Sequence, residues 1–198
     1  MLGHLSISGY VAESSDSERE KASSADNQQE RLVRLGWVIG FVDGEGCFSL
    51  GLVGQPDRPG RKGYGIGYQV FHEFVVTQGE KSLAALEALR SFFGVGQIYR
   101  NRRKDNHRED IFRYVVRRRD DLLRVIVPFF ETNPLWTAKH KDFELFAEAV
   151  RRMEAGAHRT SEGFTGILEL ASRMNRQKPR TNRIGILRGQ TPDTRDTG

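Results

Sequence analysis

Residues 36–50, GWVIGFVDGEGCFSL, constrain the fold more than any other stretch of the chain. Apolar side chains lie on nearly every face of the segment 32–44, which predicts a buried helix. This helix runs into two acids, Asp43 and Glu45, and the alternating CFSLGLV after them predicts a strand. A carboxylate at a helix C-terminus meets the negative end of the helix dipole, at a cost of about 0.3–1 kcal/mol. The position of these two acids at a helix C-terminus therefore requires an explanation.

After this helix, a pattern of two strands and one helix occurs twice. YGIGYQVFHEFVVTQ pairs with the first strand across the turn-rich GQPDRPGRKG, and the amphipathic GEKSLAALEALRSFF ends at Gly94 and Gly96. VGQIYRNRR and IFRYVVRR form the second pair, and DDLLRVIVPFF is the second helix. We predict an α+β fold of order α-β-β-α-β-β-α, with one four-stranded antiparallel sheet and helices on one face. Further helices are expected at about 138–153 and 164–174.

The ends of the chain differ from its middle. Residues 1–30 hold two basic and six acidic residues with few large apolar groups, which predicts a mostly disordered acidic leader. The core domain is expected over 31–178, followed by a basic and then flexible tail over 179–198. One cysteine excludes an internal disulfide and a thiolate zinc cage. Neither a signal peptide nor a membrane-spanning run stands out, so we expect an intracellular location: a bacterial or archaeal cytoplasm, or an organelle.

Positive charge concentrates in the middle of the chain, which carries +5 overall. Residues 99–119 contain nine Lys or Arg against three acids. Such a segment behind an acidic leader indicates a polyanionic partner, although charge alone fits a solvated surface equally well.

One face of the predicted sheet carries polar side chains. Alternation in the second strand, and Ile98 taken as inward in the third, place donors, acceptors and aromatic rings on the open face. Such groups read base edges in a major groove, although a solvent-facing sheet would also be polar. The local excess of arginine favours nucleic acid. The residues predicted to contact DNA are Ser49, Gln69, Glu73, Gln97, Tyr99, Asn101, Arg103 and Arg113.

Glycines recur every four residues along the first helix, at Gly36, Gly40 and Gly44. They form a ridge without side chains, at about 1 kcal/mol each in helix propensity. Another backbone is expected to approach there, either a neighbouring helix of the same chain or the same helix of a second copy. We predict a homodimer, with Trp37 also in the interface. Pairing would bring the acids of two copies together, where a divalent cation such as Mg²⁺ neutralises them. A metal beside a basic surface indicates phosphodiester chemistry.

VIGFVDGEG, residues 38–46, resembles the nonamer of the LAGLIDADG homing endonucleases. A single copy resembles the single-motif, homodimeric branch. The likeness extends over about 33–178 and includes VTQ, FFGVG and PLWTAKHKDFELF. The resemblance implies the family's saddle-shaped sheet and Mg²⁺-dependent cutting of both strands of a long, nearly palindromic DNA target. It also implies a role in the mobility of an intron.

The resemblance assigns roles to several residues. Glu45 stands at the position of the essential metal-binding acid, with the Gly44 carbonyl as a further ligand, whereas Asp43 matches an acid of more structural role. Gln78 falls where a polar residue orders active-site water. Lys139 matches the basic residue that approaches the scissile phosphate, with Lys141 as the alternative.

The chain departs from the family pattern at Ser82, where a second basic residue is expected. The same fold also serves as an RNA-binding maturase that assists intron splicing, and as a DNA-binding regulator without cleavage. The acid at position 45 argues against the regulator. A maturase would need a surface other than the sheet, because A-form RNA hides its major groove. Cys47 is expected to be buried, and Trp37 and Trp136 to be core or interface anchors.

Overall fold

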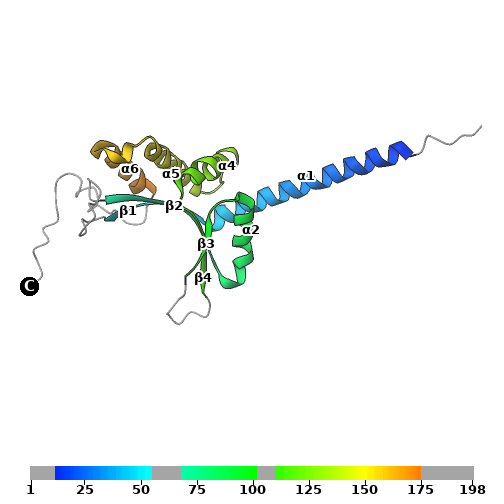
Figure 1. The fold of residues 1–198 in the computed structure, drawn as a ribbon, viewed down its shortest axis with the longest axis horizontal. Coiled ribbons are helices and arrows are strands. Elements are labelled where there is room, and N and C mark those ends of the chain that lie inside the picture. The colour runs from blue at the N-terminus through cyan, green and yellow to red at the C-terminus, as the bar shows by residue number, and fades with distance from the viewer. Residues whose placement is uncertain (1–11, 55–67, 102–109, 175–198) are drawn as a thin grey trace, which may run out of the picture. The chain divides into compact units, whose positions relative to one another are not determined.

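The computed structural model describes residues 12–54, 68–101 and 110–174, and for residues 12–26 it describes the backbone alone (Figure 1). Helix α1 spans Ala12–Glu45. Its residues up to Gly40 belong to one compact unit, and the chain from Phe41 onward forms a second unit that contains the sheet.

The sheet has four antiparallel strands in the order β1-β2-β4-β3. They are β1 (Gly46–Gly54), β2 (Tyr68–Gly79), β3 (Gln97–Asn101) and β4 (Ile111–Val116). Gly46 pairs with Val76, and Phe74 pairs with Val116. The predicted fold class and element order are confirmed.

In chain order, α1 precedes the sheet, and the other described helices come after its second strand, β2, or after its last, β4 (Figure 1). They are η1 (Glu80–Ser82), α2 (Leu83–Phe93), α3 (Arg119–Asp121), η2 (Leu122–Ile126), α4 (Val127–Thr132), α5 (Lys139–Glu154), η3 (Ala157–Arg159) and α6 (Ser161–Met174). The predicted helix over 120–130 is a continuous run from α3 to α4, and its middle is a π-helical turn. That turn lies next to Pro128, which has no N–H for an ordinary helical bond.

Aromatic rings fill the core between the sheet and the helices. The ring centroid of Phe48 in β1 lies 5.2 Å from that of Phe74 in β2. It also lies 5.3 Å and 5.4 Å from Phe143 and Phe146 of α5. The ring of Phe93 in α2 stacks on that of Tyr114 in β4, with their centroids 6.4 Å apart. The Phe93 centroid also lies 6.2 Å from that of Phe74. Helices α2 and α5 therefore pack on the same face of the sheet, the one to which Phe48, Phe74 and Tyr114 point.

Residues 12–30 are helical, although the sequence predicts a mostly disordered leader over 1–30. No glycine or proline interrupts the chain between Ala12 and Leu35, and Ala, Glu and Gln favour helix. Residues 1–11, Arg103 and the tail from residue 175 lie outside the described residues. Among the helices that the structure describes, none is long and apolar enough to cross a membrane.

Candidate functional site at the end of the first helix

A lysine from a distant part of the chain neutralises the end of α1. The last turn of α1 holds no basic residue of its own. Instead, the Lys139 ammonium donates to the carbonyl oxygens of Val42 at 2.9 Å, Asp43 at 2.8 Å and Gly44 at 3.1 Å. These carbonyls have no partner within the helix, and a cation is favourable at the negative end of the helix dipole.

Asp43 makes the reciprocal contact. Its carboxylate accepts hydrogen bonds from the backbone N–H groups of Trp136 at 3.0 Å and Thr137 at 3.1 Å, and from the Thr137 hydroxyl at 2.7 Å. Helix α5 begins two residues later, at Lys139. The carboxylate thus satisfies N–H groups that precede a helix start, as a capping residue does. We call Asp43, Thr137 and Lys139 the helix-end clasp.

The clasp shifts the pKa of both charged members. Burial alone would raise the pKa of Asp43. The hydrogen bonds from Thr137 and Trp136 and the charge of Lys139 outweigh that effect and lower the pKa. Burial lowers the pKa of Lys139, and the negative charges of Asp43 and Glu45 oppose the shift only in part. Asp43, to which the family resemblance assigned a structural role, is therefore held by the segment that leads into α5.

Glu45 ends the helix in an exposed position, one residue before β1. The turn into the strand is tight, because a Cβ added to Gly46 would lie 2.7 Å from the Val42 carbonyl oxygen. The charge of Glu45 acts on Lys139. The structure thus brings together three of the residues assigned from the resemblance: Gly44, Glu45 and Lys139.

Gln78 and Ser82 lie further along the chain. Gln78 is half-buried in β2 and pairs with Phe112, two residues beyond the pair of Val76 with Gly46. It therefore lies past the end of β1, on the side of the sheet where α1 joins. Ser82 is exposed at the start of α2.

The oxygen atoms at this helix end suit a hard divalent cation. Within the described residues, no group of three or more His, Cys, Asp or Glu side chains gathers to hold a metal ion. Mg²⁺, however, is commonly bound by one or two carboxylates together with water and substrate phosphates. The Glu45 carboxylate and the Gly44 carbonyl fit that pattern. Their neighbour Lys139 already shows that the carbonyls attract positive charge.

Strand register places the predicted DNA contacts on one face of the sheet, opposite to Phe48, Phe74 and Tyr114. Ser49 pairs with Glu73, Tyr99 pairs with Arg113, and Gln97 pairs with Val115. The face thus includes Ser49, Gln69, Glu73, Gln97, Tyr99, Asn101 and Arg113. Arg103, the eighth residue of the prediction, lies outside the described residues.

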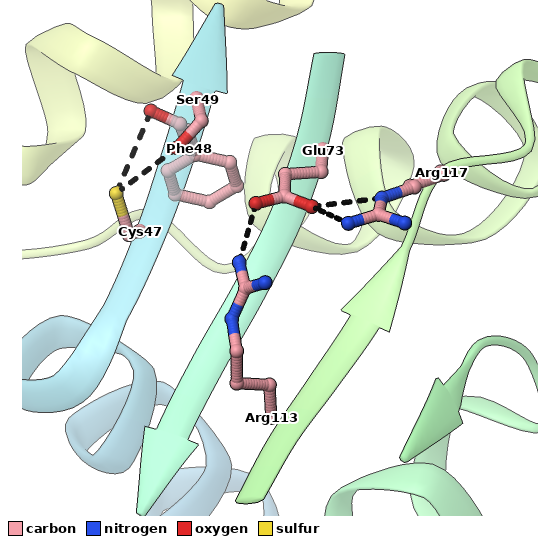
Figure 2. Close-up of polar contacts among 6 residues, drawn as sticks. All are labelled: Cys47, Phe48, Ser49, Glu73, Arg113 and Arg117. Atoms are coloured by element: carbon pink, nitrogen blue, oxygen red, sulfur yellow. Dashed lines mark hydrogen bonds and ion pairs between the residues drawn. The ribbon is translucent and has the colours of Figure 1, made fainter. Parts of the chain in front are cut away.

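Glu73 differs from the other members of this face, because it is 4% exposed. Its Oε1 accepts from Arg113 Nη2 at 2.6 Å, and its Oε2 lies 2.8 Å from Arg117 Nη2 and 2.9 Å from Arg117 Nε (Figure 2). The sequence prediction missed Arg117. The alternation of IFRYVVRR, continued one step past the strand, places it on the same face as Arg113 and Val115.

Two other expectations are wrong. Cys47 is exposed rather than buried, with its Sγ 3.4 Å from Ser49 Oγ (Figure 2). It alternates with the core residue Phe48 and so points to the opposite face. Trp136 is 91% exposed, so the expectation that it anchors the core is wrong: its backbone N–H donates to Asp43 while its ring is exposed. The alternative role as an interface anchor stays a prediction.

Comparison with known proteins shows a family match over the segment that contains this site. The sequence model of the family described as LAGLIDADG endonuclease matches residues 38–150, which is more than half of the chain. The chain belongs to that family. The matched segment contains the helix end, all four strands and the clasp, so the LAGLIDADG resemblance and the α+β fold are confirmed together.

Individual members of the LAGLIDADG endonuclease family align over most of this chain. Probable intron-encoded endonuclease 3 of Neurospora crassa is 33% identical over 141 residues, which are 70% of this chain and 24% of that protein. The crystal structure of the homing endonuclease I-TnaI has a TM-score of 0.64 at 37% identity, covering 78% of this chain and 95% of that one. I-SmaMI, bound to an uncleaved DNA target in the presence of calcium ions, has a TM-score of 0.63 at 28% identity, covering 81% and 52%. Three curated relatives are matched over 24% to 26% of their own length, so the chain spans about a quarter of each.

Proposed function

We propose that this LAGLIDADG chain is a site-specific homing endonuclease that hydrolyses phosphodiester bonds in both strands of duplex DNA. It does so with Mg²⁺ or another divalent cation, as a homodimer on a long, nearly palindromic target, and it promotes the mobility of an intron. The observation that carries the proposal is the exposed Glu45 at a helix end whose carbonyls are held by Lys139. The names of the relatives, which include intron-encoded endonucleases, support the biological role.

In this proposal each residue at or near the helix end has a separate role. Glu45 and the Gly44 carbonyl hold the cation, which when bound supplies an activated water and stabilises the leaving oxygen. Lys139 brings positive charge toward the scissile phosphate, and Gln78 orders water. Asp43 accepts a hydrogen bond from Thr137 and so holds the segment that carries Lys139 against the helix end.

The open face of the sheet is proposed to lie in the major groove. Ser49, Gln69, Gln97, Tyr99, Asn101 and Arg113 supply donors, acceptors and an aromatic ring on that face. Tyr99 is 50% exposed and Arg113 retains exposed surface, so both are accessible to a ligand. Arg103 is proposed as a further contact from the segment beyond β3.

The proposed dimer uses the glycine ridge of α1. A Cβ added at Gly36, Gly40 or Gly44 would meet nothing within 4 Å. Large apolar side chains beside the ridge are exposed: Leu32 at 56%, Val33 at 64% and Trp37 at 38%. An exposed apolar stripe next to a ridge of glycines fits the same helix of a second copy, whose backbone can approach closely.

Cleavage of a randomised duplex library, with Mg²⁺ or with EDTA, tests the proposal directly. Sequencing of the cut ends is expected to show Mg²⁺-dependent cuts at one nearly palindromic sequence. Glu45→Gln is expected to abolish cutting, because an amide binds Mg²⁺ far more weakly than a carboxylate, while DNA binding stays within a few-fold. Glu87→Gln in α2 makes the same charge change at an exposed site away from the helix end and should cut normally.

Retained cleavage by Glu45→Gln would contradict the site assignment. Selective retention of a DNA sequence without any cuts would instead favour a DNA-binding regulator. If the wild-type chain neither cuts nor selects DNA, binding assays with intron RNA become decisive for the maturase alternative.

A further inference from the structure

The centre of the open sheet face holds a carboxylate that cannot reach DNA. Glu73 is 4% exposed, and both of its oxygens accept hydrogen bonds from arginines. A glutamate that reads DNA uses an exposed carboxylate to accept a hydrogen bond from the N4 amino group of cytosine. Glu73 lacks that exposure, so its place among the sequence-predicted DNA contacts needs another explanation.

The two arginines keep part of their donor capacity. A guanidinium has five N–H groups, arranged as two edges that each carry a parallel pair. Arg117 uses the edge with Nε and Nη2 on Glu73, and Arg113 uses one N–H of Nη2. Within the part of the chain that the structure describes, each arginine therefore retains one complete pair of N–H groups. The side chains are 32% and 50% exposed, so these pairs are accessible from the open face.

Aromatic rings restrict Arg117 further. Its guanidinium carbon lies 5.6 Å from the ring centroid of Phe71 and 5.9 Å from that of Tyr99. Stacking on rings together with an ion pair fixes the plane of a guanidinium more firmly than either contact alone. Arg113 lies opposite Tyr99 in the register of β4 and β3. Arg113 belongs to β4, one of the two central strands, and Arg117 follows the last residue of that strand, while Glu73 belongs to the other central strand, β2.

We infer that Glu73 is a positioning residue, which aligns Arg113 and Arg117 so that their free N–H pairs read guanine O6 and N7 in the major groove. This inference rests on the proposed function and adds a base preference to it. Guanine is favoured over phosphate because Glu73 orients both guanidinium groups, and the rings of Phe71 and Tyr99 further restrict that of Arg117. A phosphate contact needs charge but little orientation. The target is therefore expected to contain guanine at two positions of each half-site.

The test compares base preferences of the full chain and its variants. Each protein is incubated with a randomised duplex library in EDTA, and the retained DNA is sequenced. Glu73→Gln has one acceptor oxygen, so it can hold only one of the two arginines. We expect the guanine preference at one or both positions to fall by roughly 5- to 150-fold, the value of one bidentate contact. Glu87→Gln, the matched control, should leave every preference unchanged.

Arg113→Gln and Arg117→Gln carry the test if Glu73→Gln does not fold, as checked by circular dichroism. Each is expected to replace guanine by adenine at one of the positions that Glu73→Gln weakens, because glutamine pairs with adenine N6 and N7. Unchanged base preferences in a folded Glu73→Gln would overturn the inference. The inference would also be overturned if the arginine variants bound DNA with a weaker dependence on salt concentration but an unchanged base preference. That result is the signature of lost phosphate contacts. If the wild-type chain enriches no sequence, the proposed function itself fails and the inference fails with it.

Discussion

A single residue can face two opposite demands at a helix end, and Asp43 shows how the chain reconciles them. Its charge opposes the dipole of α1, but its oxygens bind the N–H groups that precede α5. Lys139 then supplies the positive charge that the helix end lacks. The unfavourable position of the acid is thus compensated within the same clasp, and Glu45 is left exposed two residues further along the chain.

The clasp predicts a pH-dependent contribution to stability. Asp43→Asn is expected to lower the free energy of unfolding at pH 7 by about 1–2 kcal/mol, because hydrogen bonds to a charged acceptor are replaced by neutral ones. The pKa of Asp43 is lowered in the folded state. Its contribution is therefore complete above the unfolded value near 3.9 and is lost as the pH falls through the folded pKa.

Urea denaturation of both proteins between pH 2 and pH 7 checks this expectation. The difference between wild type and Asp43→Asn should shrink toward zero at the acid end. Asp120→Asn, which removes an exposed i,i+4 pair with Arg124, should change stability by less than about 0.5 kcal/mol. A gap between wild type and Asp43→Asn that stays constant with pH would show that the carboxylate charge plays no part.

At the scale of elements, the connection from α2 to β3 has two glycines with different tasks. Both adopt the left-handed region, Gly94 with φ of 68° and Gly96 with φ of 83°. A Cβ at Gly94 would meet nothing within 4 Å, whereas a Cβ at Gly96 would lie 2.8 Å from Tyr114 Cε2 and 2.9 Å from the Val115 carbonyl oxygen. Tyr114 is itself fixed by its hydroxyl, which donates to the Val95 carbonyl at 2.8 Å.

This pair of glycines separates backbone strain from steric contact. Gly94→Ala is expected to lower the free energy of unfolding by about 1 kcal/mol, from the left-handed backbone alone. Gly96→Ala should cost at least about 2 kcal/mol, because the methyl group also collides with β4. Guanidinium denaturation of the two variants gives the comparison. Equal losses would mean that the turn relaxes around the added methyl group.

Alternation and helical periodicity were enough to predict the strands, the helices and their order, because each depends on neighbouring residues. The clasp could not be predicted in this way. Only the family resemblance indicated that Lys139 belongs to the same site as Glu45, and no local sequence pattern links Asp43 to Thr137. The prediction that Cys47 is buried relied on the general preference of cysteine for the core, and it was wrong. The alternation of Cys47 with Phe48 already indicated that it lies on the open face.

Residues 1–30 and Glu73 show what composition and polarity leave open. The disorder of the leader stays a prediction, and within the described residues the helix α1 begins at Ala12. Polarity placed Glu73 among the DNA contacts, but its burial depends on Arg113 in β4 and Arg117 just after that strand, 40 and 44 residues away.

At the scale of the whole molecule, the glycine ridge predicts the oligomeric state. Gly40→Leu is expected to convert the proposed dimer to a monomer, because the leucine side chain would hold two α1 helices apart. Leucine also favours helix by roughly 1 kcal/mol over glycine, so loss of the dimer cannot be ascribed to loss of the helix. Sedimentation velocity at several concentrations measures the change.

Ala84→Leu, on the exposed surface of α2, adds similar bulk outside the ridge and should sediment as the wild type does. An unchanged dimer in Gly40→Leu would refute the ridge as the interface. The cleavage assay run on the same samples should show loss of double-strand cutting in parallel with loss of the dimer.

The helix-end clasp has a consequence for the order of folding. Its partners are separated by 93 to 97 residues, and the segment between them contains all four strands. Closing so long a loop is entropically unfavourable until the sheet and its helices have already brought the ends together. We therefore expect the clasp to close only together with the packing of α5 on β1, so that Glu45 gains Lys139 as a neighbour when the core itself forms.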